Sequence, residues 1–254
     1  MRLTAIGTGT ASPTADAVNA GWLVAAGDVR LLLDCGSGVV HRMATLGIDW
    51  RTITHVAITH FHADHISDLA TLITAWRYGD LPPRSAAVEI IGPPGTLGMI
   101  GRTAALFGEW MLEPGFPLTV RELADDRPAP LGAGMTISAR PVPHSPESVA
   151  YLVARGARRI VYTGDTGPDD TLGAWAAGCD VLVTECSLPR AMAVPAHLTP
   201  EDCAALAAAA RPGTLVLTHR YPALATVDIA AIVGTRYTGP VVLATDGWTI
   251  ELED

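Results

Sequence analysis

The sequence predicts an α/β protein in which two mixed β-sheets pack face to face and helices cover both outer faces, a four-layer αββα sandwich. Three observations predict it. Apolar runs of strand length open each half of the chain, strands and amphipathic helices then alternate, and both halves follow this order. The chain is long enough to bury one large core, and we expect a single domain over residues 1–254 around a shared cleft.

The first half begins with three predicted strands, over residues 2–6, 21–26 and 29–34. Gly27 and Asp28 form a two-residue hairpin turn between the second and third strands. A helix over residues 36–46 ends at Gly47, and residues 55–59 form a short buried strand. The next helix is predicted over residues 64–78, because apolar residues recur on one side of it at Ile66, Leu69, Leu72 and Ile73.

The second half repeats the theme. Strands are predicted over residues 135–141, 149–154, 159–163, 180–184, 215–218, 240–244 and 248–251. Helices are predicted over residues 171–177, 199–211 and 227–235. The helix at 199–211 starts favourably, because Thr199 suits the cap, Pro200 fits the first turn and two acids follow. Residues 79–130, rich in proline and glycine, are expected to form an irregular flap or lid.

Composition limits the function classes. The formal net charge is −9 and no run of basic residues occurs, which argues against long-range attraction of nucleic acid. The chain shows neither a membrane-spanning apolar stretch nor a secretory leader, so we expect a cytoplasmic protein. Its cysteines are scattered, which argues against a zinc knuckle and against a disulfide framework; they are Cys35, Cys179, Cys186 and Cys203.

A cluster of metal-ligand residues follows the predicted strand at 55–59. His60 and His62 alternate in an extended segment, so their side chains share one side. The chain then turns into a helix, which brings Asp64 and His65 to the same end. Imidazole and carboxylate are suitable ligands for zinc and similar metals. Because these four side chains cannot easily all reach one ion, the cluster indicates two metal ions side by side.

Two metals need further ligands, and three candidates each follow a predicted strand. His144 comes after the strand at 135–141, Asp165 after the strand at 159–163 and His219 after the strand at 215–218. Loops at strand ends are where rigid scaffolds carry their sites. One rim of the sheets can therefore collect all of these side chains.

The ordered set resembles the metallo-β-lactamase fold superfamily. It runs from Gly7-Thr8-Gly9 and Leu33-Asp34-Cys35-Gly36, through the cluster at 59–65, to Ala244-Thr245-Asp246-Gly247. The resemblance implies the αββα sandwich and two zinc ions, with manganese or iron(II) as substitutes. It assigns the first metal to His60, His62 and His144, the second to Asp64, His65 and His219, and a bridging role to Asp165.

The resemblance also implies a hydrolase whose nucleophile is a hydroxide between the two metals. Asp165 stands where the β-lactamase members carry a cysteine, which argues against a lactam substrate. Glu185, followed by the segment His197-Leu198-Thr199, resembles the ribonuclease Z-like phosphodiesterase branch. There, His197 would protonate the leaving group and Glu185 would orient it. The candidate catalytic residues are accordingly Asp64, His197 and Glu185.

The chain departs from that branch in one respect. Only twenty residues separate His144 from Asp165, too few for the long arm with which such enzymes grip tRNA. This argues against stable tRNA binding and favours a small phosphodiester or a nucleic-acid end. Candidate substrate-binding residues, for which packing is the alternative role, are Ser145, Arg220 and Tyr221.

Two other functions are compatible with the same residues. One is hydrolysis of a carboxylic ester, thioester, lactone or sulfate ester on the same metal centre. The other is a catalytically idle member that acts as a binding module. Because related folds often dimerise, a homodimer is also expected as a possible assembly.

Overall fold

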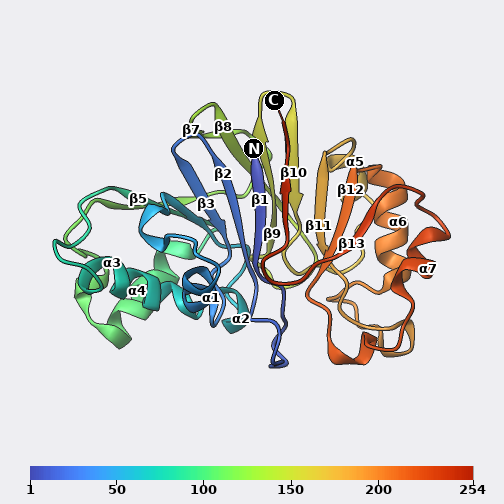
Figure 1. The fold of residues 1–254 in the computed structure, drawn as a ribbon, viewed down its shortest axis with the longest axis horizontal. Helices are drawn as coiled ribbons and strands as arrows, with labels where there is room; N and C mark the ends of the chain where they lie inside the picture. Colours follow the sequence, from blue (N-terminus) through green and yellow to red (C-terminus); the bar gives the residue numbers. More distant parts are fainter. Residues whose placement is uncertain (254) are drawn as a thin grey trace.

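The computed structural model describes residues 1–253, and two β-sheets face each other at its centre (Figure 1). The first sheet has seven strands in the order β14-β1-β2-β3-β4-β5-β6. Their bounds are β1 Arg2–Gly7, β2 Gly21–Ala26, β3 Val29–Leu33, β4 His55–Ala57, β5 Val88–Gly92, β6 Leu118–Glu122 and β14 Thr249–Glu251. Strands β2 and β3 form the predicted hairpin, and Gly27 takes a positive φ at its turn.

The second sheet also has seven strands, in the order β13-β12-β11-β10-β9-β8-β7. Their bounds are β7 Ala129–Gly132, β8 Met135–Pro141, β9 Val149–Arg155, β10 Arg158–Tyr162, β11 Val181–Glu185, β12 Thr214–Thr218 and β13 Val241–Leu243. Strands β7 to β10 pair antiparallel and strands β10 to β13 pair in parallel, so this sheet is mixed, as predicted.

Helices cover the outer face of each sheet. The first sheet carries α1 Val39–Thr45, α3 Asp68–Tyr78 and α4 Thr96–Phe107, and the second carries α5 Leu172–Trp175, α6 Pro200–Ala210 and α7 Ile229–Gly234. The short helix α2 Ala63–Ile66 lies at the rim, and the 3₁₀ turns are η1 Trp50–Thr52, η2 Glu109–Met111, η3 Arg190–Met192 and η4 Pro222–Leu224. The order of layers confirms the predicted αββα sandwich.

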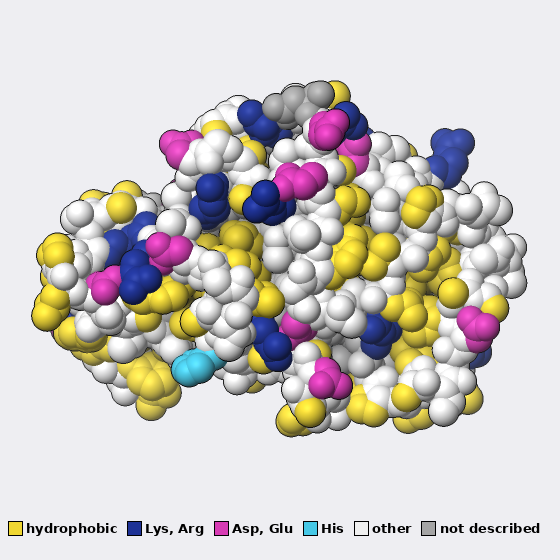
Figure 2. Space-filling model, viewed as in Figure 1, with side chains coloured by type: hydrophobic (Ala, Val, Ile, Leu, Met, Phe, Trp, Pro, Cys, Tyr) yellow, Lys and Arg dark blue, Asp and Glu magenta, His cyan; other side chains and the backbone are white. Residues whose placement is uncertain are grey.

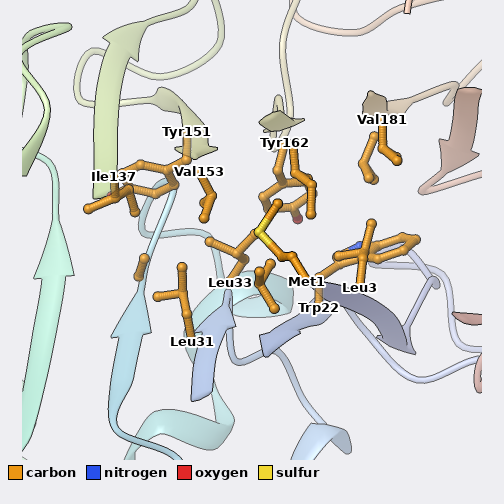
Figure 3. Packing of buried hydrophobic residues seen from close by; sticks show 14 of the residues in the cluster. Met1, Leu3, Trp22, Leu31, Leu33, Ile137, Tyr151, Val153, Tyr162 and Val181 are labelled. Carbon is orange, nitrogen blue, oxygen red and sulfur yellow. The ribbon is translucent and has the colours of Figure 1, made fainter. Parts of the chain in front are cut away.

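The central core lies between the two sheets (Figure 3). Leu31, Leu33 and Trp22 project from the first sheet toward Tyr151 and Tyr162 of the second, and all five side chains are buried. Each such apolar side chain contributes about 1.5–3 kcal/mol when it leaves water. One further cluster lies between each sheet and the helices that cover it, so each sheet is packed on both faces.

Strands from both sheets end at one rim. Strands β3 and β4 run parallel in the first sheet, as do β10, β11 and β12 in the second. Strand β8 runs in the same direction as β10, because both are antiparallel to β9. In Figure 1 this rim lies at the bottom, near α2, whereas both chain termini lie at the top. The loops that leave these strands are therefore collected at one edge.

The helix predicted over residues 64–78 is divided into α2 and α3 at Ser67. The carbonyl oxygen of Asp64 accepts a hydrogen bond from the Ala20 amide instead of from Asp68. The Asp68 amide in turn donates to the carbonyl oxygen of Cys35. The helical hydrogen bond between Asp64 and Asp68 is thus replaced by tertiary hydrogen bonds to Ala20 and Cys35, which divides the helix.

The prediction of an irregular segment over residues 79–130 was wrong, because it contains β5, α4, β6 and β7. Helix α4 was not predicted because it contains Gly98 and Gly101, and glycine is a poor helix former. Packing overrides that preference, because Met99 and Ile100 of α4 are buried among the residues that cover the first sheet. A covering role for the loops of this segment stays a prediction.

Helix α6 begins as the sequence predicts. The Thr199 hydroxyl accepts a hydrogen bond from the Asp202 amide, and the Asp202 carboxylate accepts one from the Thr199 amide. Pro200 occupies the first turn. Among the described residues, no helix combines the length and the apolar character needed to cross a bilayer.

Candidate metal centre

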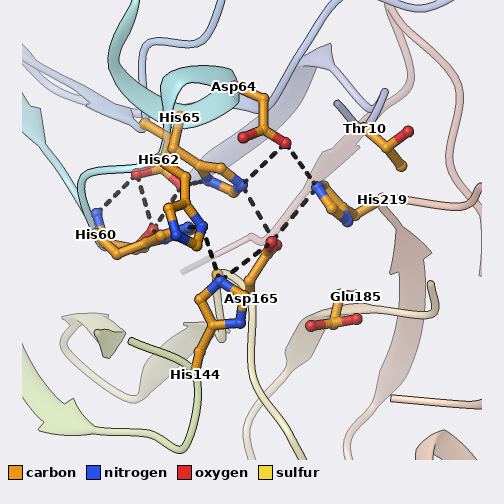
Figure 4. Close-up of polar contacts among 12 residues, drawn as sticks. Thr10, His60, His62, Asp64, His65, His144, Asp165, Glu185 and His219 are labelled. Atoms are coloured by element: carbon orange, nitrogen blue, oxygen red, sulfur yellow. Dashed lines mark hydrogen bonds and ion pairs between the residues drawn. The ribbon is translucent and has the colours of Figure 1, made fainter. Parts of the chain in front are cut away.

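Seven candidate ligands meet at the rim where strands of both sheets end (Figure 4). His60 and His62 lie in the loop after β4, and Asp64 and His65 lie in α2. The others follow β8, β10 and β12, and they are His144, Asp165 and His219. Residues separated by up to 159 positions therefore converge on one volume, as the order of strands predicted.

The first group consists of His60, His62 and His144. Nε2 of His60 lies 3.1 Å from Nδ1 of His62, and Nε2 of His144 lies 3.0 Å from the same atom. Burial, together with the neighbouring His65, lowers the pKa of His60 to about 2. A neutral imidazole offers a lone pair to a metal. The three ring nitrogens lie close enough together for one cation to bind all of them.

The second group consists of Asp64, His65 and His219. Nε2 of His219 lies 3.2 Å from Oδ2 of Asp64, and Nε2 of His65 lies 3.9 Å from that oxygen. Burial alone would raise the pKa of Asp64. The hydrogen bond from His219 and the charge of His65 outweigh it and lower this pKa to about 2. The carboxylate is therefore ionised, as a metal ligand must be.

Asp165 lies between the two groups. Its Oδ1 is 3.3 Å from Nε2 of His65, and its Oδ2 is 3.5 Å from Nε2 of His219 and 3.9 Å from Nε2 of His144. Burial would raise its pKa, but His219 and His65 hold the pKa well below the ordinary range. One buried carboxylate thus contacts members of both groups, which is the position that a bridging ligand needs.

Two buried atoms at the centre, Nε2 of His65 and Oδ1 of Asp165, face each other at 3.3 Å as an ion pair and make no hydrogen bond of ordinary geometry with any described residue. Nδ1 of His65 lies 2.7 Å from Oδ2 of Asp34, so this nitrogen donates and Nε2 is the nitrogen that faces the centre. Burial disfavours charge on His65, but Asp165 and Asp34 outweigh it and raise the pKa of the ring. An imidazole nitrogen and a carboxylate oxygen that are buried without ordinary hydrogen bonds, in a site that attracts positive charge, are suitable ligands for divalent metal ions.

A buried network behind the centre holds the ligands in place. Asp34 accepts hydrogen bonds from the Thr59 amide at 2.7 Å and from the Tyr162 hydroxyl at 2.8 Å, in addition to its contact with His65. Its φ of 59° is unusual for a residue other than glycine, which indicates strain held by the surrounding contacts. No local sequence pattern indicates a role for Tyr162, because its partner Asp34 lies 128 positions away.

His219 is fixed from two sides. Its amide donates to the carbonyl oxygen of Thr8 at 3.0 Å, and its φ is 52°. Its Nδ1 lies 3.1 Å from the hydroxyl of Ser187, a contact that the sequence did not indicate. Gly7 permits the approach of the loop that carries Thr8, since a Cβ there would lie 1.8 Å from the Asn19 carbonyl oxygen. The first loop therefore supports the centre through the carbonyl oxygen of Thr8.

A second pair of side chains adjoins the ligands. Nδ1 of His197 lies 2.9 and 3.1 Å from the two carboxylate oxygens of Glu185, which is fully buried at the end of β11. The His197 ring lies 4.9 Å from that of His144. Burial disfavours the charged ring, but the hydrogen bond to Glu185 outweighs it and raises the pKa of His197. The ring therefore stays protonated to a higher pH than a free imidazole.

The candidate substrate-binding residues are placed differently from one another. The Tyr221 ring lies 5.7 Å from that of His219 and 6.4 Å from that of His197, so the structure brings it to the centre. The Arg220 guanidinium donates to the carbonyl oxygens of Leu217 and Ala244, which engages it in packing. The hydroxyl of Ser145 lies 2.7 Å from that of Ser148, within a turn.

The chain matches known proteins over most of its length. A family model described as the beta-lactamase superfamily domain matches residues 29–220. A ribonuclease Z of Mycobacterium bovis (strain BCG / Pasteur 1173P2) is 31% identical, over 99% of this chain and 98% of the relative. A ribonuclease Z of Mycobacterium sp. (strain KMS) is 32% identical, over 99% and 96%.

Solved structures share the fold. The metallo-beta-lactamase fold protein YhfI from Bacillus subtilis superposes with a TM-score of 0.84 at 23% identity, over 98% of each chain. The short form of human tRNase Z superposes with a TM-score of 0.81 at 24% identity, over 100% of each chain. At these identities the likeness is one of fold.

Proposed function

The chain belongs to the metallo-β-lactamase superfamily as a ribonuclease Z-like member, and from this membership we propose that it is a dinuclear zinc phosphodiesterase. It is a metal-dependent hydrolase whose substrate is a nucleic-acid end or a small phosphodiester. The position of Asp165 carries this proposal, because its carboxylate contacts both histidine groups at once.

The donor set supports the choice of metal. Six of the seven candidate ligands form two groups of three, and Asp165 is shared between them. Imidazole nitrogens and single carboxylate oxygens suit zinc, with manganese or iron(II) as replacements. Two such ions would supply Lewis acidity toward the phosphoryl group and would lower the pKa of a bound water. The residues proposed to hold them are His60, His62, His144, Asp64, His65, His219 and Asp165.

Asp64 has a double role in this proposal. Its lowered pKa keeps the carboxylate ionised at neutral pH, and 13% of its side chain is exposed. Beyond ligation, an ionised carboxylate at the centre can accept a hydrogen bond from the attacking water and so orient it. We assign Asp64 both roles.

His197 is proposed as the general acid. Glu185 accepts a hydrogen bond from Nδ1 of His197, and the carboxylate is itself held by the amides of Thr166 and Leu198. The ring is thereby fixed beside His144, with its raised pKa favouring a proton on Nε2. A proton delivered from Nε2 to the leaving oxygen completes cleavage of the P–O bond. Tyr221, whose ring contacts both His197 and His219, is proposed to contact the substrate beside that proton donor.

The substrate must be held without a long arm. Of the elements in the described chain, only β9 and β10 lie between His144 and Asp165. We therefore propose that the enzyme acts on the end of an RNA strand through surfaces close to the metal centre, without a stable grip on folded tRNA. Because the relatives named ribonuclease Z point to an RNA substrate, we propose that this activity takes place in the cytoplasm. A homodimer is the proposed assembly.

The test compares substrates on the zinc-loaded protein. A short oligoribonucleotide should be cleaved, whereas p-nitrophenyl acetate, a lactone and an aryl sulfate should not. His62→Ala should abolish cleavage, and His41→Ala, a change on the exposed face of α1, should leave it intact. Turnover of the acetate, lactone or sulfate without phosphodiester cleavage would assign the centre to the ester hydrolases instead.

A further inference from the structure

The loops that follow β8, β10 and β11 meet at Gly167, which lies in the loop after β10. The Gly167 amide donates a hydrogen bond to the carbonyl oxygen of Pro143, the residue before His144. A Cβ added to Gly167 would lie 1.9 Å from the carbonyl oxygen of Pro195, which comes two residues before the proposed acid His197. Only a residue without a side chain therefore allows these loops to come so close.

Segment 194–197 joins the proposed acid to the metal centre. Nδ1 of His144 lies 2.9 Å from the carbonyl oxygen of Ala196 and donates to it, because a carbonyl oxygen can only accept. The amide of His197 donates to the carbonyl oxygen of Val194 at 3.3 Å, which closes the segment into a turn. The segment thus contacts one candidate ligand and carries the proposed acid. Its position decides how far that acid lies from the metals.

The loop that carries Gly167 is held more firmly than segment 194–197. Thr166 is fully buried, and its amide donates to the Glu185 carboxylate at 2.7 Å. The first two residues of the segment, by contrast, are exposed. A side chain at position 167 would therefore displace the exposed segment rather than the buried loop.

His144 has a support of its own. The Val142 amide donates to the carbonyl oxygen of Ser148, and the Ser148 amide donates to the carbonyl oxygen of Ser145, each at 3.0 Å. These two hydrogen bonds close the turn that carries His144 without any contribution from segment 194–197. Displacement of the segment would therefore move the acid relative to the candidate ligands more than it moves the ligands themselves.

The placement of the acid matters most for a substrate that is held loosely. On the face shown in Figure 2, basic side chains are scattered among acidic ones and form no continuous surface that could grip RNA. A misplacement of about 1 Å in an active site can lower a rate about 10²-fold. We propose that Gly167 is a positioning residue: the space left by its missing side chain accommodates segment 194–197 and thereby holds His197 beside His144. This inference rests on the proposed function.

The test compares two changes from glycine to alanine. Gly167 has no positive φ, so Gly167→Ala tests the contact alone. Gly101→Ala is the matched control, because the space around a Cβ at that position of α4 is open. Pro195→Gly loosens segment 194–197 from the other side, and the exposed position of Pro195 keeps the fold intact.

We expect Gly167→Ala to lower kcat for a short oligoribonucleotide about 10–100-fold, because the leaving oxygen of this substrate needs a proton. Hydrolysis of methyl p-nitrophenyl phosphate, whose leaving group needs none, should fall far less, and zinc content should stay at the wild-type value. Pro195→Gly should show the same preference with a smaller loss, and Gly101→Ala should change neither rate. An unchanged kcat for the oligoribonucleotide in Gly167→Ala, an equal fall for both substrates, or loss of zinc would overturn the inference.

Crystal structures of the metal-free wild type and of Gly167→Ala give a readout that does not depend on activity. The separation between the rings of His144 and His197, which is 4.9 Å here, should increase in the variant. An unchanged separation would overturn the inference. If the wild type hydrolyses neither substrate, the proposed function is contradicted, and the ring separation still decides whether Gly167 positions His197.

Discussion

Nδ1 of His65 lies 2.7 Å from Oδ2 of Asp34, and both side chains are fully enclosed. The contact leaves Nε2 of His65 as the nitrogen that faces the centre. Asp34 makes this contact while its backbone is held at a positive φ. Aspartates that orient a metal-binding histidine in this way affect metal affinity without touching the metal.

We predict that Asp34→Ala lowers the affinity for zinc about 10–100-fold. It also leaves the hydroxyls of Tyr162 and Thr59 without their buried acceptor, which should lower the free energy of unfolding by about 1–3 kcal/mol. Asp34→Asn keeps the shape and should have a smaller effect on both. Competition with a chelator measures the affinity, and zinc binding by Asp34→Ala as tight as in the wild type would refute the orienting role.

Ser187 connects His219 to Glu185. Its hydroxyl donates to the Glu185 carboxylate and so accepts from Nδ1 of His219, which holds the ring with Nε2 toward Asp64 and the centre. We predict that Ser187→Ala weakens the binding of one of the two ions about tenfold, whereas Ser187→Thr retains it. Isothermal titration of the metal-free protein with zinc distinguishes the two sites. Equal zinc binding by both variants would show that the hydroxyl does not hold the His219 ring in place.

The proposed acid, His197, predicts a dependence on the leaving group. A nucleoside oxygen needs a proton as it leaves, whereas p-nitrophenolate does not. His197→Ala should therefore lower kcat for an oligoribonucleotide about 10²–10⁴-fold and should affect methyl p-nitrophenyl phosphate far less. Zinc content, measured in parallel, should stay at the wild-type value. A similar fall for both substrates would point to a structural role instead.

The cysteines are predicted to be inert in the folded protein. All four are buried, burial raises the pKa of Cys179 to about 12, and it also raises the pKa of Cys35 and Cys203. A raised pKa leaves little thiolate at pH 8, and the thiolate is the reactive form. Dithiodipyridine should label none of them in the native protein and all four after unfolding. Rapid labelling of a cysteine in the native state would contradict this placement.

Much of the site was predictable because its signal is local or ordered along the chain. The cluster at His60 to His65 lies in one turn, and each later candidate follows an apolar strand, so their meeting at one rim follows from parallel strands. The helix α6 was equally predictable, since its cap and first turn are encoded in adjacent residues.

What the sequence left open depends on distant partners. The contacts of Asp34 with Tyr162 and of Ser187 with His219 join residues that no local pattern connects. Helix α4 was missed because its glycines oppose helix formation, and packing against the first sheet decides the outcome. Arg220 follows a candidate ligand in the chain, yet its guanidinium turns to backbone carbonyls.

The proposed phosphodiesterase activity depends on two metal ions that share Asp165 as a ligand. Its most direct test is a titration of the metal-free protein with zinc while the hydrolysis of methyl p-nitrophenyl phosphate is followed. We predict that the rate rises until about two equivalents of zinc per chain are bound, as a two-metal centre requires. Saturation at one equivalent, or no hydrolysis at any zinc concentration, would contradict the account.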